Sequence, residues 1–414
     1  MQLNKFFAAG AVATFALLGW TLCFSPAESA TISESGTSSY LPRTVDNLET
    51  TPDGAWEIQK LMRGDIETGE MNESGMNELR DEVIRMASQQ GSSDRSTEHY
   101  WNEMGPDNIG GRTRAIVAVI PEDGSEETVL YAGSVSGGLW KSDNGGNDWN
   151  QMFGLDNTVI GSLAVTGNGD LYVGSGSIYE GGSGEGGSEF RGRGIWWSND
   201  GENFTMVEGT DPGQFAGGDF SATDALVADP GDDDRVWFGS NAGYGFIENG
   251  VLTMSPGNIS GPVSDMAIAA DGSYMLVGMT NCRVYRSTDA AFTDFVSVSG
   301  SNNDDTVLPQ SGNGRLRVAI SIDDANSAFV VFATSGGSFG GLYYSGNAGQ
   351  EGTWSNVWPN DIAEATPLPR NQGIYDLALG VQQGNPEMAY VGGIELWRSG
   401  PNQQAELAAY AFDF

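Results

Sequence analysis

Histidine and positive charge are scarce in this sequence. Its 414 residues contain one histidine, His99, and only three lysines, Lys5, Lys60 and Lys141. Ser-His-Asp catalysis, histidine-ligated zinc and lysine Schiff-base chemistry therefore have almost no residues to draw on. Lysine and arginine number 19 against 55 aspartates and glutamates, which gives a formal net charge of -36. Because so acidic a chain repels phosphate polymers, nucleic acid is excluded as the expected partner.

Cysteine is rare as well, with only Cys23 and Cys282. Lys5 precedes an apolar run from Phe6 to Phe24, which ends at Ser25-Pro26 before small residues. This pattern predicts a signal peptide over residues 1–30, with an uncleaved anchor as the alternative because the run is long. Cleavage would leave Cys282 without a disulfide partner, so we expect it to be a buried residue in a strand.

No later segment reaches the roughly 20 apolar residues that span a bilayer, so no membrane span is expected after signal cleavage. We therefore expect a secreted or cell-surface protein. Residues 31–100 read as a Ser/Thr-rich spacer followed by a short helical preface. In that preface Trp56, Leu61 and Met62, and later Leu79, Val83 and Met86, recur at helical spacing.

Glycine, at 60 residues, and tryptophan, at 11, are abundant. From Trp101 onward the sequence repeats every 45 to 58 residues or so. Each repeat contains an apolar strand, a strand ending in small residues, a glycine-rich loop and a strand ending near serine. That period is typical of four-stranded propeller blades. The sequence predicts an all-β fold, a β-propeller of about six blades over residues 101–400. Residues 401–414 match no blade strand and stay unassigned, and Tyr100–Met104 is an alternative fourth strand for the last blade.

The turn after the third strand carries a motif of the form S-x-D-x-G-x-x-W, the Asp box, in four units. Asp or Asn there would bond nearby backbone amides, glycine would supply a positive φ, and the aromatic ring would plug between sheets. We expect these residues to be structural, and Trp149→Ala to cost about 3 kcal/mol or more if its ring is buried. The motif residues are Ser142, Asn144, Gly146, Trp149, Ser198, Asp200, Phe204, Ser287, Asp289, Ser345, Asn347, Gly349 and Trp354.

The stretches WNEMGPDNIGGRTRAI and YAGSVSGGLWKSDNGGNDW resemble the opening of secreted Asp-box (BNR repeat, sortilin-like) propellers of Bacteroidota. The resemblance covers about Thr51 to Ser399. It implies export, further blades and often a sorting domain for type IX secretion. This chain stops soon after Ser399, which suggests a truncated product. Wider relatives include sialidases and xyloglucan-cleaving glycosidases, so the resemblance specifies the fold more closely than the function.

Aligning the expected innermost strands places Arg114, Ser162, Asp224, Asp265, Arg317 and Asp376 at one equivalent position facing a central channel. These side chains either pair with one another or form a polar ligand site. In the second case Arg114 and Arg317 would bind ligand, and Asp224, Asp265 and Asp376 are the candidate catalytic carboxylates. Removing both arginines is expected to abolish glycan binding and spare the fold.

A glycine-rich insertion, residues 174–194, is the second candidate site. Tyr179, Glu180, Arg191 and Arg193 in it suit a sugar ring or a carboxylate, and Tyr244 is expected beside them on the channel face. A solvated surface loop is the alternative. The acidic turns at 230–234, 303–305 and 323–324 lack EF-hand spacing, so we expect no cofactor or metal, with calcium as the one open possibility.

Together these features favour an exported, non-catalytic propeller for recognition or scaffolding, with an extracellular glycan or protein as its partner. The alternative is a glycoside hydrolase, xyloglucanase-like or sialidase-like, that uses the channel carboxylates.

Overall fold

The computed structural model describes Arg85 and residues 112–119, 128–155, 157, 159–179, 192–212, 218–300, 306–310, 312–358 and 371–409. The chain divides into two units, residues 1–48 and 49–414, and every element below belongs to the second. The predicted signal peptide at 1–30 lies outside the described residues. So do the spacer and helical preface at 31–100, apart from Arg85, which is helical.

Six four-stranded antiparallel sheets make up the propeller, and each uses four strands that follow one another in the chain. Blade 1 contains β1 (Thr113–Val119), β2 (Val129–Ser134), β3 (Leu139–Ser142) and β4 (Asn150–Met152). Blade 2 contains β5 (Ile160–Val165), β6 (Leu171–Ser175), β7 (Ile195–Ser198) and β8 (Thr205–Met206). Blade 3 contains β9 (Thr223–Ala228), β10 (Arg235–Ser240), β11 (Gly243–Glu248) and β12 (Val251–Met254).

The second half of the chain repeats this arrangement. Blade 4 contains β13 (Val263–Ile268), β14 (Met275–Met279), β15 (Val284–Ser287) and β16 (Phe295–Ser297). Blade 5 contains β19 (Asn313–Ile320), β20 (Ala328–Thr334), β21 (Phe339–Ser345) and β22 (Trp354–Asn356). Blade 6 contains β23 (Ala378–Val381), β24 (Ala389–Gly392), β25 (Leu396–Gly400) and β26 (Gln403–Ala409). A short parallel pair, β17 (Ser299–Gly300) with β18 (Leu308–Pro309), and the one-turn helix α4 (Gly373–Asp376) lie between blades.

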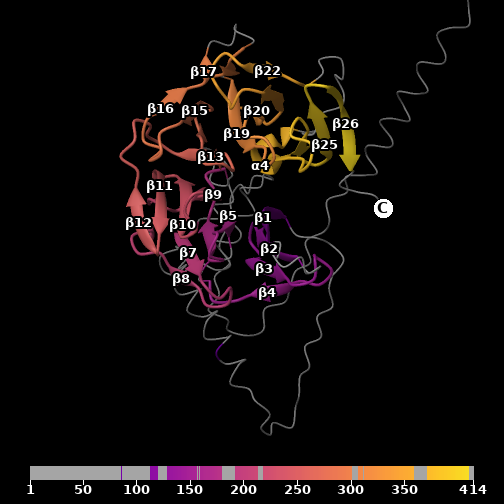
Figure 1. Cartoon of the computed structure of the whole chain (residues 1–414). Coiled ribbons are helices and arrows are strands. Elements are labelled where there is room, and N and C mark those ends of the chain that lie inside the picture. The colour runs from indigo at the N-terminus through magenta and orange to yellow at the C-terminus, as the bar shows by residue number, and fades with distance from the viewer. Residues whose placement is uncertain are drawn as a thin grey trace, which may run out of the picture. The chain divides into compact units, whose positions relative to one another are not determined.

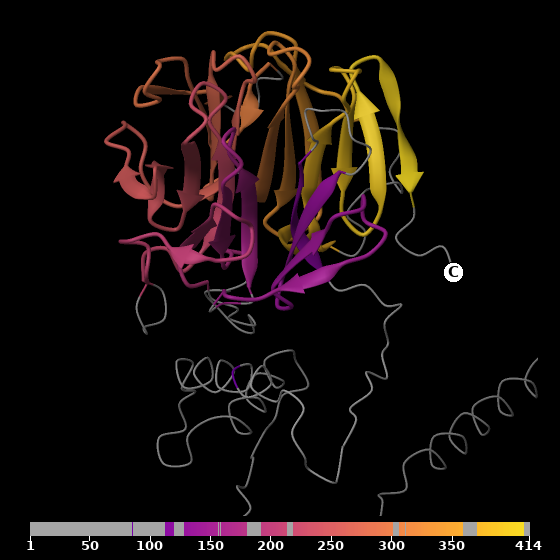
Figure 2. The ribbon, with the colours of Figure 1, turned by 60° about the horizontal axis from the view of Figure 1, so that its bottom comes forward.

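The first strand of each blade is the innermost one. Each of these strands from β1 to β19 contacts the first strand of the next blade, and the blades follow each other around a centre, from purple to yellow in Figure 1. Figure 2 shows the same blades from the side. The second strands of blades 2 to 5, such as β20, are almost wholly buried because blades pack on both of their faces. This explains their nearly continuous apolar sequences, such as AFVVFA.

The apolar core consists of five clusters, and each lies between two consecutive blades. Leu139 and Ile160 join blades 1 and 2, and Tyr172 and Phe238 join blades 2 and 3. The remaining clusters join blades 3 and 4, 4 and 5, and 5 and 6. No such cluster joins blades 6 and 1 within the described residues.

The tail left unassigned by the sequence proves to contain a blade strand. Residues 403–409 form β26, which pairs with β25 as the fourth strand of blade 6. The chain therefore fills this position with its own next segment, and Tyr100–Met104, which lie outside the described residues, are not needed there. The sequence QQAELAA was missed because it carries none of the aromatic and glycine markers of the other repeats.

The Asp-box turns connect third and fourth strands in blades 1, 2, 4 and 5. In blade 1, the amide of Gly146 donates to Ser142 Oγ at 2.8 Å, and the amide of Asp148 donates to Asn144 Oδ1 at 2.9 Å. In blade 2, Asp200 Oδ1 accepts from Ser198 Oγ and from the amide of Asn203. These bonds replace the ladder bonds that a tight turn loses.

The two tryptophans of these turns differ in burial. Trp354 of blade 5 is 1% exposed, whereas Trp149 of blade 1 is 36% exposed. The expectation of a buried Trp149 ring is therefore wrong. Its indole instead donates to Gly146 O at 3.0 Å on the surface of blade 1.

Candidate functional site

The innermost strands of blades 1 to 5 share a β-bulge near their starts, and their pairing with the second strands sets which side chains are equivalent. Ala115, Ser162, Ala225, Asp265 and Arg315 each pair with the corresponding residue of the second strand just after the bulge. Arg114 and Asp224 are the bulged residues themselves, Arg317 lies two positions further on, and Asp376 belongs to α4. The expected ring of six equivalent side chains is therefore wrong. Ser162 and Asp265 are equivalent, whereas Arg114 and Asp224 lie one position before them and Arg317 lies two positions after them.

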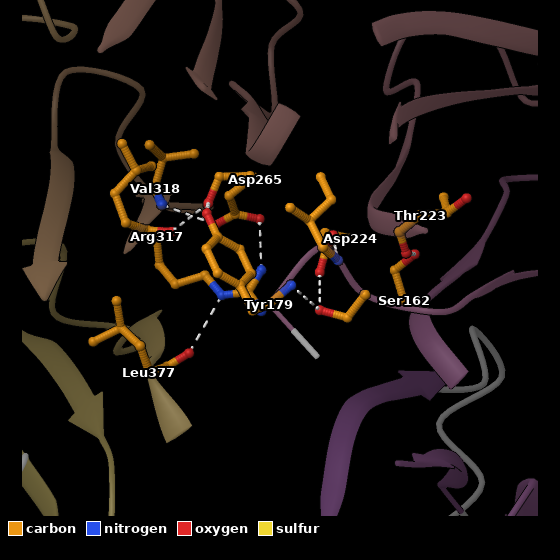
Figure 3. Close-up of polar contacts among 12 residues, drawn as sticks. Ser162, Tyr179, Thr223, Asp224, Asp265, Arg317, Val318 and Leu377 are labelled. Atoms are coloured by element: carbon orange, nitrogen blue, oxygen red, sulfur yellow. Dashed lines mark hydrogen bonds and ion pairs between the residues drawn. The ribbon is translucent and has the colours of Figure 1, made fainter. Parts of the chain in front are cut away.

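Tyr179, in the segment Ser177–Tyr179 that follows β6 of blade 2, lies between Asp224 on one side and Asp265 with Arg317 on the other (Figure 3). Tyr179 Oη donates to Ser264 Oγ of blade 4 at 2.5 Å, and Ser264 Oγ donates to Leu316 O of blade 5 at 3.0 Å. The Arg315 guanidinium lies over the Tyr179 ring, 4.6 Å from its centroid. Burial raises the pKa of Tyr179 above its usual value, so the phenol stays neutral.

Asp224 of blade 3 holds this segment in place. Its Oδ1 accepts from Ser177 Oγ at 2.5 Å, and its Oδ2 accepts from the amide of Ile178 at 2.8 Å. Asp224 is 2% exposed. Both oxygens of this carboxylate are thus engaged by donors of the blade 2 segment.

Asp265 of blade 4 pairs with Arg317 of blade 5. Arg317 Nη1 lies 3.3 Å from Asp265 Oδ1, and the amide of Val318 donates to Asp265 Oδ2 at 2.9 Å. The guanidinium also donates through Nε to Leu377 O. Burial raises the pKa of Asp265 above its ordinary value, although the Arg317 charge acts in the opposite direction. Arg317 thus links blades 4 and 5 to the start of blade 6.

Arg315 is the channel residue that the sequence analysis missed. It is 2% exposed, and Nη1 donates to Ile374 O, while no described group bonds its Nε. The pKa of Arg315 is lowered to about 9, chiefly by burial and to a smaller extent by the nearby positive charge of Arg317. Arg315 and Asp265 hold equivalent positions in their blades, each directly before an apolar residue of the inner strand, Leu316 or Met266. This shared position is the signal that could have revealed Arg315.

The remaining candidates fall in several places. Arg114 lies at the β1 bulge, near enough for its charge to lower the pKa of Arg315 further. Asp376 lies 3.9 Å from Arg112, and burial raises its pKa. Tyr244 is 3% exposed and bonds Phe292 O between blades 3 and 4, so its expected position on the channel face is wrong.

The insertion at 174–194 is described only at its two ends. Glu180 and Arg191 lie outside the described residues. Arg193 is described and is bound through its backbone. Its amide donates to Ser175 Oγ at 2.6 Å, and its carbonyl accepts from Trp196 Nε1 at 2.8 Å. A binding role for Glu180, Arg191 and Arg193 stays a prediction.

A concavity on the outer part of the propeller lies between the Asp-box turns of blades 4 and 5. Its volume is about 280 Å³, and its walls include Arg286, Thr288, Asp294, Val296, Gln350 and Glu351. Arg286 is fixed there because its Nε donates to Ala348 O at 2.6 Å and its guanidinium lies 4.8 Å from the Tyr274 ring centroid. In the described part of the chain, the two terminal nitrogens of Arg286 have no protein partner. Val296 beside it is 60% exposed.

Carboxylates of two acidic turns are bonded to other protein groups. Asp232 pairs with Arg235 at 3.0 Å, and Asp323 Oδ2 accepts from the amide of Gly384 at 2.6 Å. Residues 303–305 lie outside the described part. Across the described ranges, no three His, Cys, Asp or Glu side chains gather in a way that would hold a metal ion. Nor does any helix in those ranges have the length and apolarity to cross a membrane.

Comparison with known proteins identifies the fold. No protein-family model matches this chain, and no curated protein matches it. The GH74 enzyme of Niastella koreensis is similar in structure, with a TM-score of 0.51 and 18% identity over 73% of this chain and 46% of that chain. This level of identity supports a β-propeller fold and nothing more specific.

Two further solved structures align at lower TM-scores. The GH74 xyloglucanase from Xanthomonas campestris has a TM-score of 0.46 and 15% identity, over 73% of this chain and 55% of that one. The extracellular domain of a putative hybrid two component system from B. thetaiotaomicron has a TM-score of 0.48 and 14% identity, over 73% and 34%. The chain thus spans about half the length, or less, of these three proteins.

Proposed function

We propose that this protein is an exported, non-catalytic β-propeller that recognises an extracellular carbohydrate. The observation that carries the proposal is the engagement of the channel carboxylates. Both oxygens of Asp224 accept bonds from Ser177 and Ile178, and both oxygens of Asp265 accept bonds from Arg317 and Val318. The ring of Tyr179 lies between the two groups (Figure 3).

Glycoside hydrolysis makes a different demand on two carboxyl groups. They must flank the scissile bond at roughly 5 to 9.5 Å from each other, and one must be free to donate a proton while the other attacks or activates water. Asp224 and Asp265 would first have to release the blade 2 segment and the Arg317 guanidinium. Breaking a buried ion pair of this kind costs about 3 to 5 kcal/mol. The contacts therefore favour recognition over the glycosidase alternative, although GH74 enzymes share the propeller fold.

The concavity between blades 4 and 5 is the better candidate for the ligand. Its volume of about 280 Å³ lies just below the range of roughly 300 to 1,000 Å³ that is usual for ligand pockets, so we propose that it takes a single sugar unit of a longer chain. Arg286 presents fixed donors, while Glu351 and Gln350 on the facing turn offer acceptors and donors for hydroxyl groups. The exposed side chain of Val296 can contact the C–H face of a sugar ring. Since the chain carries a net charge of -36 and acidic groups line the cavity, a neutral glycan fits better than an anionic one.

Affinity electrophoresis through gels containing neutral polysaccharides tests this proposal, with a polyuronate gel as the anionic comparison. We expect at least one neutral polysaccharide to retard the protein, and Glu351→Ala to weaken that binding about tenfold. Glu208→Ala, which removes the same charge from an exposed turn in blade 2, serves as the matched control. Absence of retardation in every gel, or equal retardation of both variants, would count against a carbohydrate site between blades 4 and 5.

A further inference from the structure

Among the described residues, the boundary between blades 6 and 1 lacks the apolar cluster found at each of the other five boundaries. On β1, Ile116 is 65% exposed. Its equivalents in blades 2 to 5 follow the same bulge and pack against the preceding blade. They are Leu163 at 9%, Leu226 at 8%, Met266 at 4% and Leu316 at 0% exposure. The fifth apolar side chain of this set thus lies on an uncovered face of blade 1.

Blade 6 shows the complementary feature. In blades 1, 3 and 4, a second-strand glycine lies directly against an apolar side chain from the next blade. The pairs are Gly133 with Ile160, Gly239 with Val263, and Gly278 with Leu316. Gly392 occupies the same register position in blade 6, but a side chain there would meet only Ala378 and Leu396 of its own blade. Ala378 and Gly380 on the adjoining inner strand are exposed.

Two equivalent tryptophans, in blades 1 and 2, have the same local hydrogen bond but differ in burial. Trp140 in blade 1 and Trp196 in blade 2 occupy the same position, and each indole donates to the carbonyl three residues earlier. Trp196 is covered by blade 1 and is 6% exposed, whereas Trp140 is only partly buried. The strand geometry of blade 1 therefore matches that of blade 2. The difference is that no described blade packs against the face of blade 1 that carries Trp140.

Blades 6 and 1 are nevertheless joined at one end of this boundary. Arg112, just before β1, donates through Nη2 to Tyr375 O at 3.1 Å, and its guanidinium lies 5.4 Å from the Tyr375 ring centroid. The Arg112 contacts connect the two blades near the channel, while the faces that carry Ile116 and Gly392 stay uncovered.

We propose that the boundary between blades 6 and 1 is a docking site for a polypeptide partner that presents one further four-stranded antiparallel blade. The argument is continuity with the established interfaces. In blades 2, 4 and 5, a first-strand apolar side chain (Ile160, Val263 or Leu316) lies against the second-strand glycine of the preceding blade. In a docked blade of this kind the equivalent side chain would seat on Gly392, and a small second-strand residue would receive Ile116. One inserted blade thereby completes both faces with the contacts that the other blades already make.

Blade 4 of this chain is a suitable probe because its contacts are known. Its Met266 packs against blade 3 and its Gly278 receives Leu316 of blade 5. Residues 255–298, which include the natural linker before β13, would be appended after Ala409. An intramolecular attachment raises the effective concentration of the probe. The matched control carries Met266→Asp in the appended copy only.

The readout is the rate at which a thiol reagent labels Ile116→Cys in a Cys23→Ser background, since Cys282 is buried. We expect rapid labelling in the chain with six blades, at least tenfold slower labelling with the appended blade, and rapid labelling again with the control. Hydrogen exchange of Thr113–Val119 gives the same readout in the chain without the cysteine substitution.

Three results would overturn the proposal. Slow labelling of the six-blade chain at every protein concentration would mean that blades 1 and 6 or other parts of the same chain cover Ile116. Protection that grows with protein concentration would assign the face to a second copy. Equal labelling with the appended blade and with its Met266→Asp control would show, if rapid, that the faces do not accept a blade and, if slow, that the cover does not depend on blade packing.

Discussion

Tyr179 of blade 2 donates through its hydroxyl to Ser264 Oγ of blade 4 at 2.5 Å, and so connects two blades that are separated by a third. The rest of this segment is held by Asp224 of blade 3. The ring also lies against Arg315 of blade 5. One short segment thus contacts three blades other than its own, and this ties the inner ends of the blades together.

Replacing this tyrosine tests the connection. Tyr179→Phe removes one buried hydrogen bond while Ser264 keeps its bond to Leu316 O, so we expect a loss of about 1 kcal/mol in the free energy of unfolding at neutral pH. Burial raises the pKa of Tyr179, whereas an unfolded tyrosine ionises near pH 10 or so. The unfolded state therefore releases this proton first, and the wild type loses stability as the pH rises above about 10.

Because Tyr179→Phe lacks this ionisation, the difference in urea stability between the two proteins should shrink between about pH 9 and pH 11. A constant difference across this range would mean that the phenol is not buried as described.

The Asp265–Arg317 pair gives a second prediction. The two side chains are 15% and 14% exposed, so removal of either partner leaves a largely buried charge. We expect Arg317→Met to destabilise the protein by about 3 kcal/mol. The double variant Asp265→Asn/Arg317→Met should be less destabilised than the sum of the single variants by at least 1 kcal/mol or so. Additive losses in urea denaturation would show that the two groups do not interact. The expected destabilisation by Arg317→Met replaces the earlier expectation that loss of the channel arginines spares the fold.

The unequal burial of the two Asp-box tryptophans gives a third prediction. Trp354→Ala should cost about 4 kcal/mol because a fully buried ring is lost between blades 4 and 5. Trp149→Ala should cost about 1 kcal/mol, since that ring is 36% exposed and loses chiefly its bond to Gly146 O. Chemical denaturation of the two variants measures both values. Equal losses would contradict the exposure of Trp149.

Cys282 provides a fourth prediction. It lies at a turn between β14 and β15, with a φ of 60°, and is 1% exposed. Burial raises the pKa of its thiol to about 12. In a Cys23→Ser chain at pH 8, a thiol reagent should therefore react only after the protein is denatured, with Cys282→Ser as the blank. Stoichiometric reaction in the native state would show that the turn is open.

The sequence was sufficient for the fold because each repeat encodes its own blade. Alternating apolar strands, marker serines and turn motifs recur whatever the tertiary contacts are. The channel was harder to predict because equivalent positions on the inner strands are set by their pairing with the second strands. The expected alignment was one position early at Arg114 and Asp224 and two positions late at Arg317, so it passed over Arg315. Tyr244 was misplaced since its burial depends on Phe292 and Phe295 of the next blade. No local pattern reports such contacts.

The most direct test of the proposed function is a reducing-end assay on the polysaccharides used for binding, carried out with the wild type and with Asp265→Asn and Asp224→Asn. The account predicts binding of a neutral glycan by the wild type with no release of reducing ends above a buffer control during a prolonged incubation. Release that disappears in either variant, while that variant keeps its cooperative unfolding and its glycan binding, would contradict the account and establish the channel carboxylates as catalytic.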